Sequence, residues 1–284
     1  MNTQEINKLK LVAYKIRKDI IVEVFNAASG HPGGSLSIAD ILSVLYFKEM
    51  NIDPKNPQNP DRDRLVLSKG HCAPALYGAL AERGYFPVED LVTLRKTDSY
   101  LEGHPDMKGI PGVDMSSGSL GQGISAANGM ALAGKIDKKD YMVYTILGDG
   151  EIEEGQVWEA AMYAAHYKLD NLVAFVDVNG LQIDGPTKEV MSAEPIDKKF
   201  EAFGFNVYII DAHDIEQISE AVQKAKNKNG KPTAIICKST KGKGVSFMEN
   251  VGSWHGKGPN KEEADAAIAE LDAKIKELEE KVNG

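Results

Sequence analysis

Hydrophobic and polar residues alternate along the chain in runs that predict strands separated by helices. Two mainly apolar runs, Tyr141–Leu147 and Asn171–Val178, are long enough for buried strands. Between them, from about Gln156 to Tyr167, apolar positions follow a helical spacing. The first run ends at Gly-Asp-Gly and the second at Asn179-Gly180, and such residues stop strands. This stretch therefore predicts a strand–helix–strand unit in which both strands end in polar residues.

The same alternation extends over the rest of the chain. An apolar residue recurs every fourth position from Val12 to Val24, which predicts a helix that ends near Ala28. We expect an α/β fold with a doubly wound, mainly parallel sheet and helices on both faces. The prediction is a single domain over residues 1–284, with a C-terminal helical tail from about residue 261. Further strands are expected at 64–67, 205–210 and 233–237, and further helices at 124–134, 215–226 and 262–281.

Polar residues follow the two strands of the central unit. Because the carboxyl ends of parallel strands share one edge of a sheet, Asp149 and Asn179 are expected to lie close together. With the backbone carbonyl near Leu181 they form an oxygen-only set of ligands, which suits Mg²⁺ or Ca²⁺. Gly148 and Gly150 let a ligand approach the backbone closely. This edge is therefore a candidate site for a divalent metal.

The acidic residues around this turn limit what binds there. Asp149, Glu151, Glu153 and Glu154 would repel a bare diphosphate. A phosphate ligand therefore needs a cation between itself and Asp149, and we expect the glutamates to point elsewhere.

Composition restricts the class of protein. The chain has 284 residues, of which 42% are hydrophobic and 26% charged, as in ordinary soluble globular proteins. The formal net charge of −9 argues against nucleic acid or an anionic membrane as a partner. The two cysteines are far apart and predict neither a disulfide framework nor a zinc site. Since no apolar run reaches membrane-spanning length and no signal peptide is evident, we expect a cytoplasmic protein.

Four of the six histidines lie beside glycines in predicted loops, at positions 31, 71, 104 and 255. Imidazoles in such loops donate hydrogen bonds to phosphate, polarise carbonyl groups or move protons. Zinc is the competing use, but no pair of these residues has the usual ligand spacing. His166 and His213 are interpreted as structural and Cys72 as a buried apolar residue. Lys241 or Lys243 could help to hold phosphate, but a solvated basic turn is the favoured interpretation.

The sequences of these motifs resemble those of one protein family. The segment GDGEIEEGQVWEAAMYAAHYKLDNL, followed by VDVNGLQIDG, is similar to transketolases, as are SGHPGG, LSKGH, GHP, SGSLGQG and SWHG. The resemblance covers the whole chain, but only the N-terminal part of transketolase that binds the diphosphate of its cofactor. It implies the thiamine diphosphate-binding fold, and thiamine diphosphate with Mg²⁺ or Ca²⁺ as cofactors.

The resemblance also implies roles for individual residues. Glu154 and Glu159 match acidic positions that the family buries at its subunit interface, where carboxylates share protons. The implied site residues are His31, His104 and His255 as catalytic; His71, Gly118, Leu120, Gly150, Glu154, Asn179 and His255 as cofactor-binding; and Asp149, Asn179 and Leu181 as metal ligands.

The sequence matches only the N-terminal part of the family's enzymes. The glutamate that activates the aminopyrimidine, the aromatic wall around that ring and the acceptor's phosphate-binding arginines belong to later domains, which this chain lacks. We therefore expect one subunit of a split transketolase in an α2β2 hetero-oligomer, active only with a partner subunit. It would transfer a glycolaldehyde unit from a ketose to an aldose (phosphate), in the pentose phosphate pathway and carbohydrate metabolism. The sequence does not name the sugar pair.

Three alternatives stay open. Another thiamine diphosphate enzyme, such as the alpha subunit of a 2-oxoacid dehydrogenase or a deoxyxylulose-phosphate synthase, shares the Gly-Asp-Gly turn. The SGHPGG, LSKGH and WHG motifs argue against such an enzyme. A non-catalytic cofactor-binding protein and a plain nucleotide-binding α/β protein are the other two.

Overall fold

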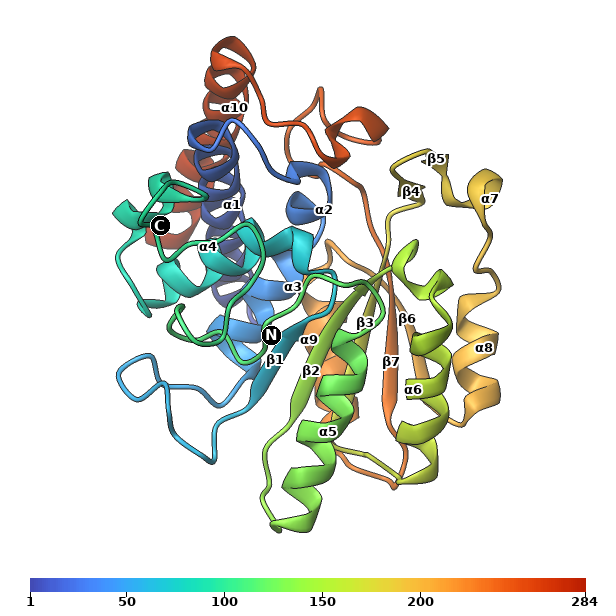
Figure 1. The fold of residues 1–284 in the computed structure, drawn as a ribbon. Coiled ribbons are helices and arrows are strands. Elements are labelled where there is room, and N and C mark those ends of the chain that lie inside the picture. The colour runs from blue at the N-terminus through green and yellow to red at the C-terminus, as the bar shows by residue number, and fades with distance from the viewer.

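One five-stranded sheet organises the computed structural model, which describes all 284 residues (Figure 1). The strand order is β1-β2-β3-β7-β6, and every neighbouring pair is parallel. The predicted α/β fold with a mainly parallel sheet is confirmed. The strands are β1 (Arg64–Leu67), β2 (Val143–Gly148), β3 (Leu172–Val178), β6 (Asn206–Asp211) and β7 (Thr233–Lys238).

Helices cover both faces of this sheet, and alternate residues of each strand point to opposite faces. In β2, Val143 and Leu147 join a cluster of 22 buried residues under one layer of helices, whereas Tyr144 and Ile146 join a cluster of 49 under the other. The smaller cluster lies under α5 (Gly123–Ile136), α6 (Gly155–His166) and α8 (Ile196–Phe203). The larger lies under α1 (Thr3–Asn26), α3 (Ala39–Val44), α4 (Ala73–Arg83) and α9 (Ile215–Lys226).

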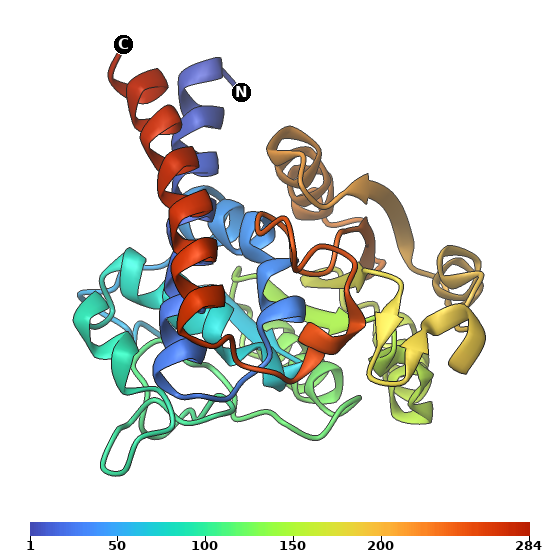
Figure 2. The ribbon, with the colours of Figure 1, turned by 90° about the horizontal axis from the view of Figure 1, so that it is seen from above.

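The first and last long helices pack side by side. α10 (Lys261–Asn283) runs along α1, so that the two ends of the chain lie together (Figure 2). Nε2 of Gln4 donates to the carbonyl of Val282 over 3.4 Å. α10 begins with a capping box, in which the side chains of Asn260 and Glu263 each accept from the other's backbone N–H. Leu271 of this helix is buried in the larger cluster.

Short elements connect the long ones. The helix after His31 begins at once with Pro32, because proline suits the first turn of a helix. The short helices are α2 (Pro32–Leu36), η1 (Leu45–Glu49), η2 (Gly70–Cys72), η3 (Val88–Thr93), η4 (Glu151–Glu153), α7 (Thr187–Val190) and η5 (Gly252–His255).

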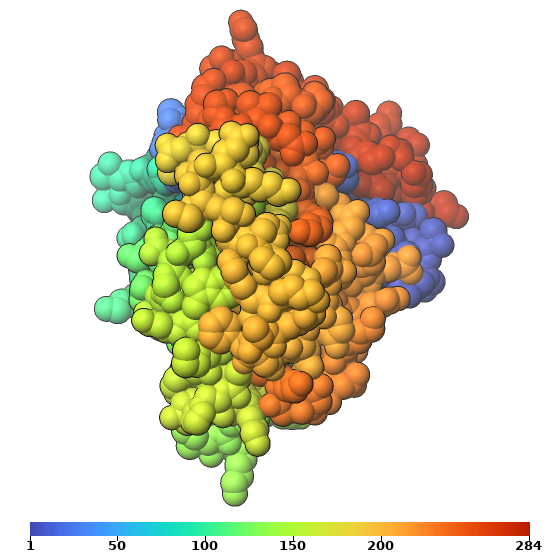
Figure 3. All heavy atoms as spheres, turned by 90° about the vertical axis from the view of Figure 1, so that its right-hand side faces the viewer, coloured from blue at the N-terminus to red at the C-terminus, as the bar shows by residue number.

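A small antiparallel pair that the sequence pattern did not predict follows β3. It consists of β4 (Leu181–Gln182) and β5 (Gly185–Pro186). The yellow atoms of this segment project at the surface in Figure 3, next to the orange atoms of the loop after β7. The chain has no helix that is both long and apolar enough to span a membrane.

Candidate active site

A cavity of about 300 Å³ opens where the strands end. Segments that follow β1, β2, β3 and β7 converge on it, together with the loop between α1 and α2 and the loop before α5. All the predicted site residues line it except His104 and Glu154. The lining residues are His31, Gly34, Lys69, His71, Gly118, Leu120, Gly148, Asp149, Gly150, Glu151, Asn179, Leu181, Gln182, Ile183, Asp184, Lys241 and His255.

The three predicted metal ligands meet in this cavity. Asp149 is 4% exposed and its carboxylate accepts from the backbone N–H of Gly180 over 2.6 Å and of Gly150 over 3.1 Å. Burial, with the charge of nearby Asp177 added, raises the pKa of Asp149 to about 6. A bound cation would relieve this penalty. One carboxylate, the Asn179 amide oxygen and the Leu181 carbonyl form a set that fits Mg²⁺ or Ca²⁺. The chain contains no group of three His, Cys, Asp or Glu side chains suited to a metal.

Three imidazole rings line the cavity together. The ring centroids of His31 and His71 lie 5.1 Å apart, those of His31 and His255 5.5 Å, and those of His71 and His255 5.4 Å. Burial and neighbouring positive groups lower the pKa of His31 and of His71 to about 4, and that of His255 to about 3. All three are therefore neutral at pH 7. Nδ1 of His31 is buried without a hydrogen-bond partner, which suits a group that binds a ligand.

Two buried lysines supply the positive charge that the neutral histidines lack. Nζ of Lys69 donates to Asp177 over 2.7 Å and to the carbonyl of Gly34 over 2.8 Å. Nζ of Lys241 donates to the carbonyl of Leu181 over 3.0 Å and lies 2.9 Å from Nδ1 of His255. An ammonium and three imidazoles around one cavity suit an anionic ligand such as a diphosphate.

The expectation of a solvated basic turn is wrong for Lys241, which is 1% exposed. It holds for Lys243, which pairs with Glu249 at the surface over 3.3 Å. The turn is fixed by the N–H of Gly242, which donates to the carbonyl of Gly33 over 2.9 Å. That contact comes from a distant segment, so the KGKG sequence alone does not reveal which lysine is buried.

The glutamates near Asp149 do not all point elsewhere. Glu151 is buried and lines the cavity, contrary to expectation. Its carboxylate accepts from Oγ of Ser68 over 2.5 Å and from the N–H groups of Gly121 and Gly148 over 3.0 Å each. These internal donors bind both oxygens of Glu151. The carboxylate thereby holds the loop before α5 against the end of β2.

His104 and Glu154 lie beside the cavity. A Cβ atom at Gly118 would lie 3.4 Å from Cδ2 of His104, so the histidine packs behind this glycine. Glu154 is exposed and packs on Gly121, whose φ of +80° favours glycine. Glu159 is exposed on α6 as well.

His213, interpreted as structural, lies outside the cavity. Its Nδ1 lies 2.8 Å from Oδ2 of Asp40, and its Nε2 accepts from the N–H of Thr240 over 2.9 Å. Because Nε2 accepts, the proton is on Nδ1, which donates to Asp40.

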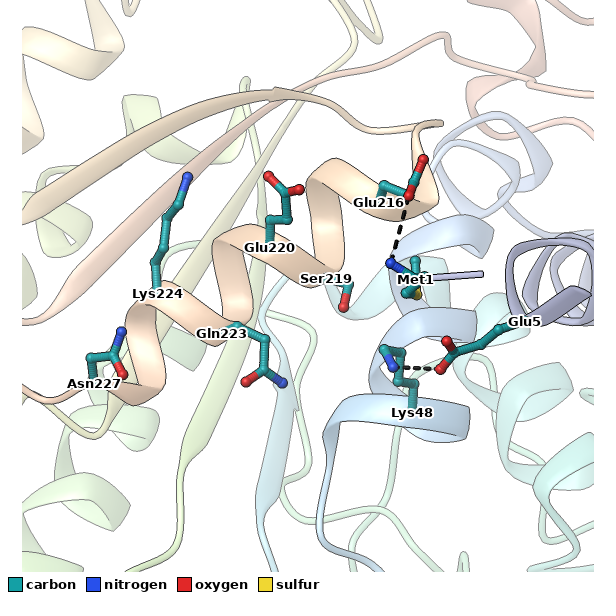
Figure 4. A pocket seen from close by; sticks show the side chains of 9 residues that line it. All are labelled: Met1, Glu5, Lys48, Glu216, Ser219, Glu220, Gln223, Lys224 and Asn227. Carbon is teal, nitrogen blue, oxygen red and sulfur yellow. Dashed lines mark hydrogen bonds and ion pairs between the residues drawn. The ribbon is translucent and has the colours of Figure 1, made fainter. Parts of the chain in front are cut away.

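A second hollow lies between the start of the chain, η1 and α9 (Figure 4). It is polar and open, and four of its charged groups form two ion pairs. The N-terminal ammonium lies 3.7 Å from Glu216, and Lys48 donates to Glu5 over 2.5 Å. No strand ends there and no buried polar atom lacks a partner there. The cavity at the strand ends is therefore the candidate active site.

The fold and the site together define a class of protein. A parallel sheet presents a carboxylate and an amide at adjoining strand ends, with imidazoles and ammonium groups above them, as in enzymes that hold an anionic cofactor through a metal ion. Residues 8–277 match the family described as "Transketolase, thiamine diphosphate binding domain". The chain therefore belongs to the transketolase family, as the sequence motifs predicted.

Relatives of similar length match nearly the whole chain. It is 50% identical to 6-deoxy-6-sulfo-D-fructose transketolase subunit SqwG of Clostridium sp. (strain MSTE9), over 96% of this chain and 98% of that protein. It is 42% identical to an apulose-4-phosphate transketolase subunit of Phocaeicola vulgatus, over 99% of each. Human transketolase is 44% identical, over 96% of this chain but 43% of its own length.

Solved structures agree with this assignment. Transketolase from Leishmania mexicana superposes with a TM-score of 0.85 at 30% identity, covering 97% of this chain and 45% of that one. Transketolase from Campylobacter jejuni gives 0.83 at 33% identity, covering 99% and 49%. The chain thus spans about half the length of these enzymes. It corresponds to the part of these enzymes that the family description gives as the thiamine diphosphate-binding domain.

Proposed function

We propose that this chain holds the diphosphate end of thiamine diphosphate and one divalent metal ion, and that a partner subunit completes the active site. The observation that supports this most directly is the convergence of Asp149, Asn179 and Leu181 with three imidazoles on one cavity. The partner would supply the pyrimidine side and the later domains, in an α2β2 hetero-oligomer.

The metal ion would bind to Asp149, Asn179 and the Leu181 carbonyl. Mg²⁺ is the first choice and Ca²⁺ the second, because both take oxygen ligands. Gly150 has no side chain beside these ligands, and a Cβ there would lie 3.2 Å from Cβ of Gln182. The diphosphate is then expected beside Gly150 and His71, where the Lys241 ammonium adds positive charge. Gly118 and Leu120 would contact the cofactor farther along the cavity, with Glu154 at the subunit interface.

When bound, thiamine diphosphate supplies the carbon nucleophile to which a ketose is added. The residues of this chain would orient the sugar and hold protons. A neutral imidazole has one N–H donor and one acceptor nitrogen. His31, His104 and His255 would donate to the sugar hydroxyl and carbonyl oxygens, and accept protons from hydroxyl groups as the carbon–carbon bond breaks. The same groups act in reverse when the aldose takes up the two-carbon unit.

The substrates are proposed as a class only. The two relatives of similar length are named for a sulfonated ketose and for a phosphorylated sugar. We infer that this chain also serves a ketose donor and an aldose acceptor, one of them with a terminal anionic group. This activity belongs to carbohydrate metabolism of the pentose phosphate type and to the cytoplasm.

Two measurements test the proposal. The first titrates thiamine diphosphate into the chain with and without Mg²⁺, by calorimetry. Asp149→Asn should raise the Mg²⁺ requirement by more than about 100-fold, since outer-shell changes alone cost roughly 10- to 100-fold. Asp140→Asn is the matched control, because Asp140 is exposed and precedes β2, whereas Asp149 follows it. Binding of the cofactor by Asp149→Asn at the original Mg²⁺ concentration would contradict the metal assignment.

The second measurement combines the chain with its partner subunit, cofactor, Mg²⁺, a ketose and an aldose. Transfer is expected only when both chains are present. Transfer by this chain alone would contradict the split site, and failure with a thiamine diphosphate-binding partner would favour a non-catalytic cofactor-binding protein.

A further inference from the structure

A buried carboxylate lies directly behind the candidate metal ligands and does not line the cavity. Asp177, near the end of β3, has no exposed surface. Its oxygen Oδ2 accepts from Nδ2 of Asn179 over 2.9 Å, from Nζ of Lys69 over 2.7 Å and from Oγ of Ser37 over 2.8 Å. Its other oxygen accepts from Oγ of Ser239. Four segments that are far apart in the sequence therefore meet on one carboxylate.

We propose that Asp177 is a positioning residue that fixes the side-chain amide of Asn179, with the nitrogen turned inward and the oxygen available to the metal. This inference rests on the proposed function, because it takes Asn179 as a ligand. An ionised carboxylate only accepts hydrogen bonds, whereas an amide has a donating nitrogen and an accepting oxygen of similar size.

Only one orientation of the amide satisfies this contact. If the amide were turned over, Oδ1 of Asn179 would face an oxygen of Asp177, and two acceptors would repel each other at 2.9 Å. With nitrogen toward Asp177, Oδ1 is left free of that contact and accepts from the N–H of Leu181 over 3.1 Å. Asn179 lines the cavity together with Leu181 and Asp149, the other two candidate ligands, whereas Asp177 does not line it.

Lys69 contacts the same oxygen of Asp177, Oδ2, that accepts from Asn179. An ammonium only donates, so this contact, like that of the amide nitrogen, requires an accepting oxygen at Asp177. Lys69 is itself buried, with 2% of its surface exposed, and its second hydrogen bond goes to the carbonyl of Gly34. The pair therefore links the orientation of Asn179 to the segment that carries His31.

The same contact explains the choice of an amide at position 179. An aspartate there would place a second carboxylate against Asp177, at the distance of a hydrogen bond. The site thus combines one charged ligand, Asp149, with neutral oxygens. Asn179→Asp is expected to bind the cofactor poorly even though it adds negative charge toward the metal.

The test is Asp177→Asn, measured on the whole chain by calorimetric titration of thiamine diphosphate over a series of Mg²⁺ concentrations. Removing an outer-shell partner should raise the Mg²⁺ concentration for half-maximal binding by roughly 10- to 100-fold. Saturating Mg²⁺ should restore the wild-type stoichiometry and cofactor affinity. A purely structural defect would instead lower the binding stoichiometry at every Mg²⁺ concentration and would not be rescued.

Two further variants keep the result decisive. Ser239→Ala removes a hydrogen bond from the other oxygen of Asp177 and should shift the Mg²⁺ midpoint by less than about threefold, because its role does not involve the amide. If Asp177→Asn does not fold with Lys69 left unpaired, the double variant Asp177→Asn with Lys69→Met removes both charges and is measured in its place. A midpoint within threefold of wild type in the folded variant would overturn the inference.

Asp149→Asn distinguishes a failure of the proposed metal site from a failure of the positioning role of Asp177. If it leaves the Mg²⁺ requirement unchanged, the proposed metal site fails, and the role of Asp177 fails with it. If Asp149→Asn loses Mg²⁺-dependent binding while Asp177→Asn keeps it, the metal site stands and only the positioning role is wrong. A large shift in both variants supports both.

Discussion

Nζ of Lys241 and Nδ1 of His255 lie 2.9 Å apart at the wall of the cavity. The ammonium has only donors, so Nδ1 of His255 must accept, and its ring proton is on Nε2. The same ammonium contributes to the low pKa of His255, after burial. One lysine thus fixes the tautomer of this histidine and, together with burial, keeps it neutral.

Lys241→Met should weaken thiamine diphosphate binding by roughly 10- to 100-fold, because a hydrogen bond to a charged group contributes about 1.5–3 kcal/mol. The pKa of His255 should rise toward its ordinary value, as the nearby positive charge is lost. Calorimetry measures the first effect and NMR titration of labelled histidine the second. Lys243→Met is the matched control, since Lys243 pairs with Glu249 at the surface. Equal effects of the two variants would contradict the assignment.

Acid should destabilise the chain through His71. Its folded pKa is about 4, below the ordinary value near 6.5, because it is buried and lies near Lys69. Between these values the unfolded chain binds a proton at His71 that the folded chain does not, so the contribution of His71 to stability falls as the pH falls. The slope is about 1.4 kcal/mol per pH unit for this group. Chemical denaturation from pH 7 to pH 4.5 measures it. His71→Asn should flatten the profile, and an unchanged slope would contradict the prediction.

A rise in pH should lower the contribution of α1 to the stability of the folded chain, because of Asp19. Asp19 of this helix is buried against Gly78 of α4, and burial raises its pKa to about 8. Glu23, one turn later, is fully buried, and neither of its carboxylate oxygens has a partner. From about pH 4 to pH 8 the folded chain keeps a proton on Asp19 that the unfolded chain releases, so the contribution of Asp19 to stability falls as the pH rises. Asp19→Asn should therefore raise the melting temperature at pH 8 more than at pH 5. A uniform change would contradict this.

Two buried tyrosines offer a matched comparison. The hydroxyl of Tyr77 lies 2.9 Å from the carbonyl of Glu102 and 3.0 Å from that of His104, whereas the hydroxyl of Tyr144 has no partner. Tyr77→Phe should lower the stability by about 0.5–1.5 kcal/mol and speed hydrogen exchange in the loop around His104. Tyr144→Phe should be neutral or stabilising, because it removes an unsatisfied polar group. A larger loss for Tyr144→Phe would contradict the hydrogen-bond assignment.

The regular elements were predictable from the sequence because their signals are local. β1 and α9 have the predicted bounds, since a short apolar run and an amphipathic period specify them, and Asp214 caps α9 by accepting from two N–H groups. The segment from β4 to α8 was missed. β4 and β5 contain two residues each, too few for a repeating pattern.

The residues that line the cavity were predictable where they belong to a recognisable sequence motif. Histidines framed by glycines and the residues that follow β2 and β3 were identified by type and position. Lys69 and Lys241 were not, because their burial depends on contacts with Asp177, Gly33 and Leu181 in distant segments. Glu151 was misplaced for the same reason, as two of its three donors, Ser68 and Gly121, lie in distant segments.

The residues of the cavity wall are spread over most of the chain, which determines when the cavity is complete during translation. Its wall draws on residues from His31 to His255, and β7 enters the sheet between two strands that are synthesised before it. A nascent chain on the ribosome therefore has no complete pocket until translation has passed position 255. Binding of the vitamin then requires that synthesis has passed this position, and shorter products of early termination have an incomplete cavity.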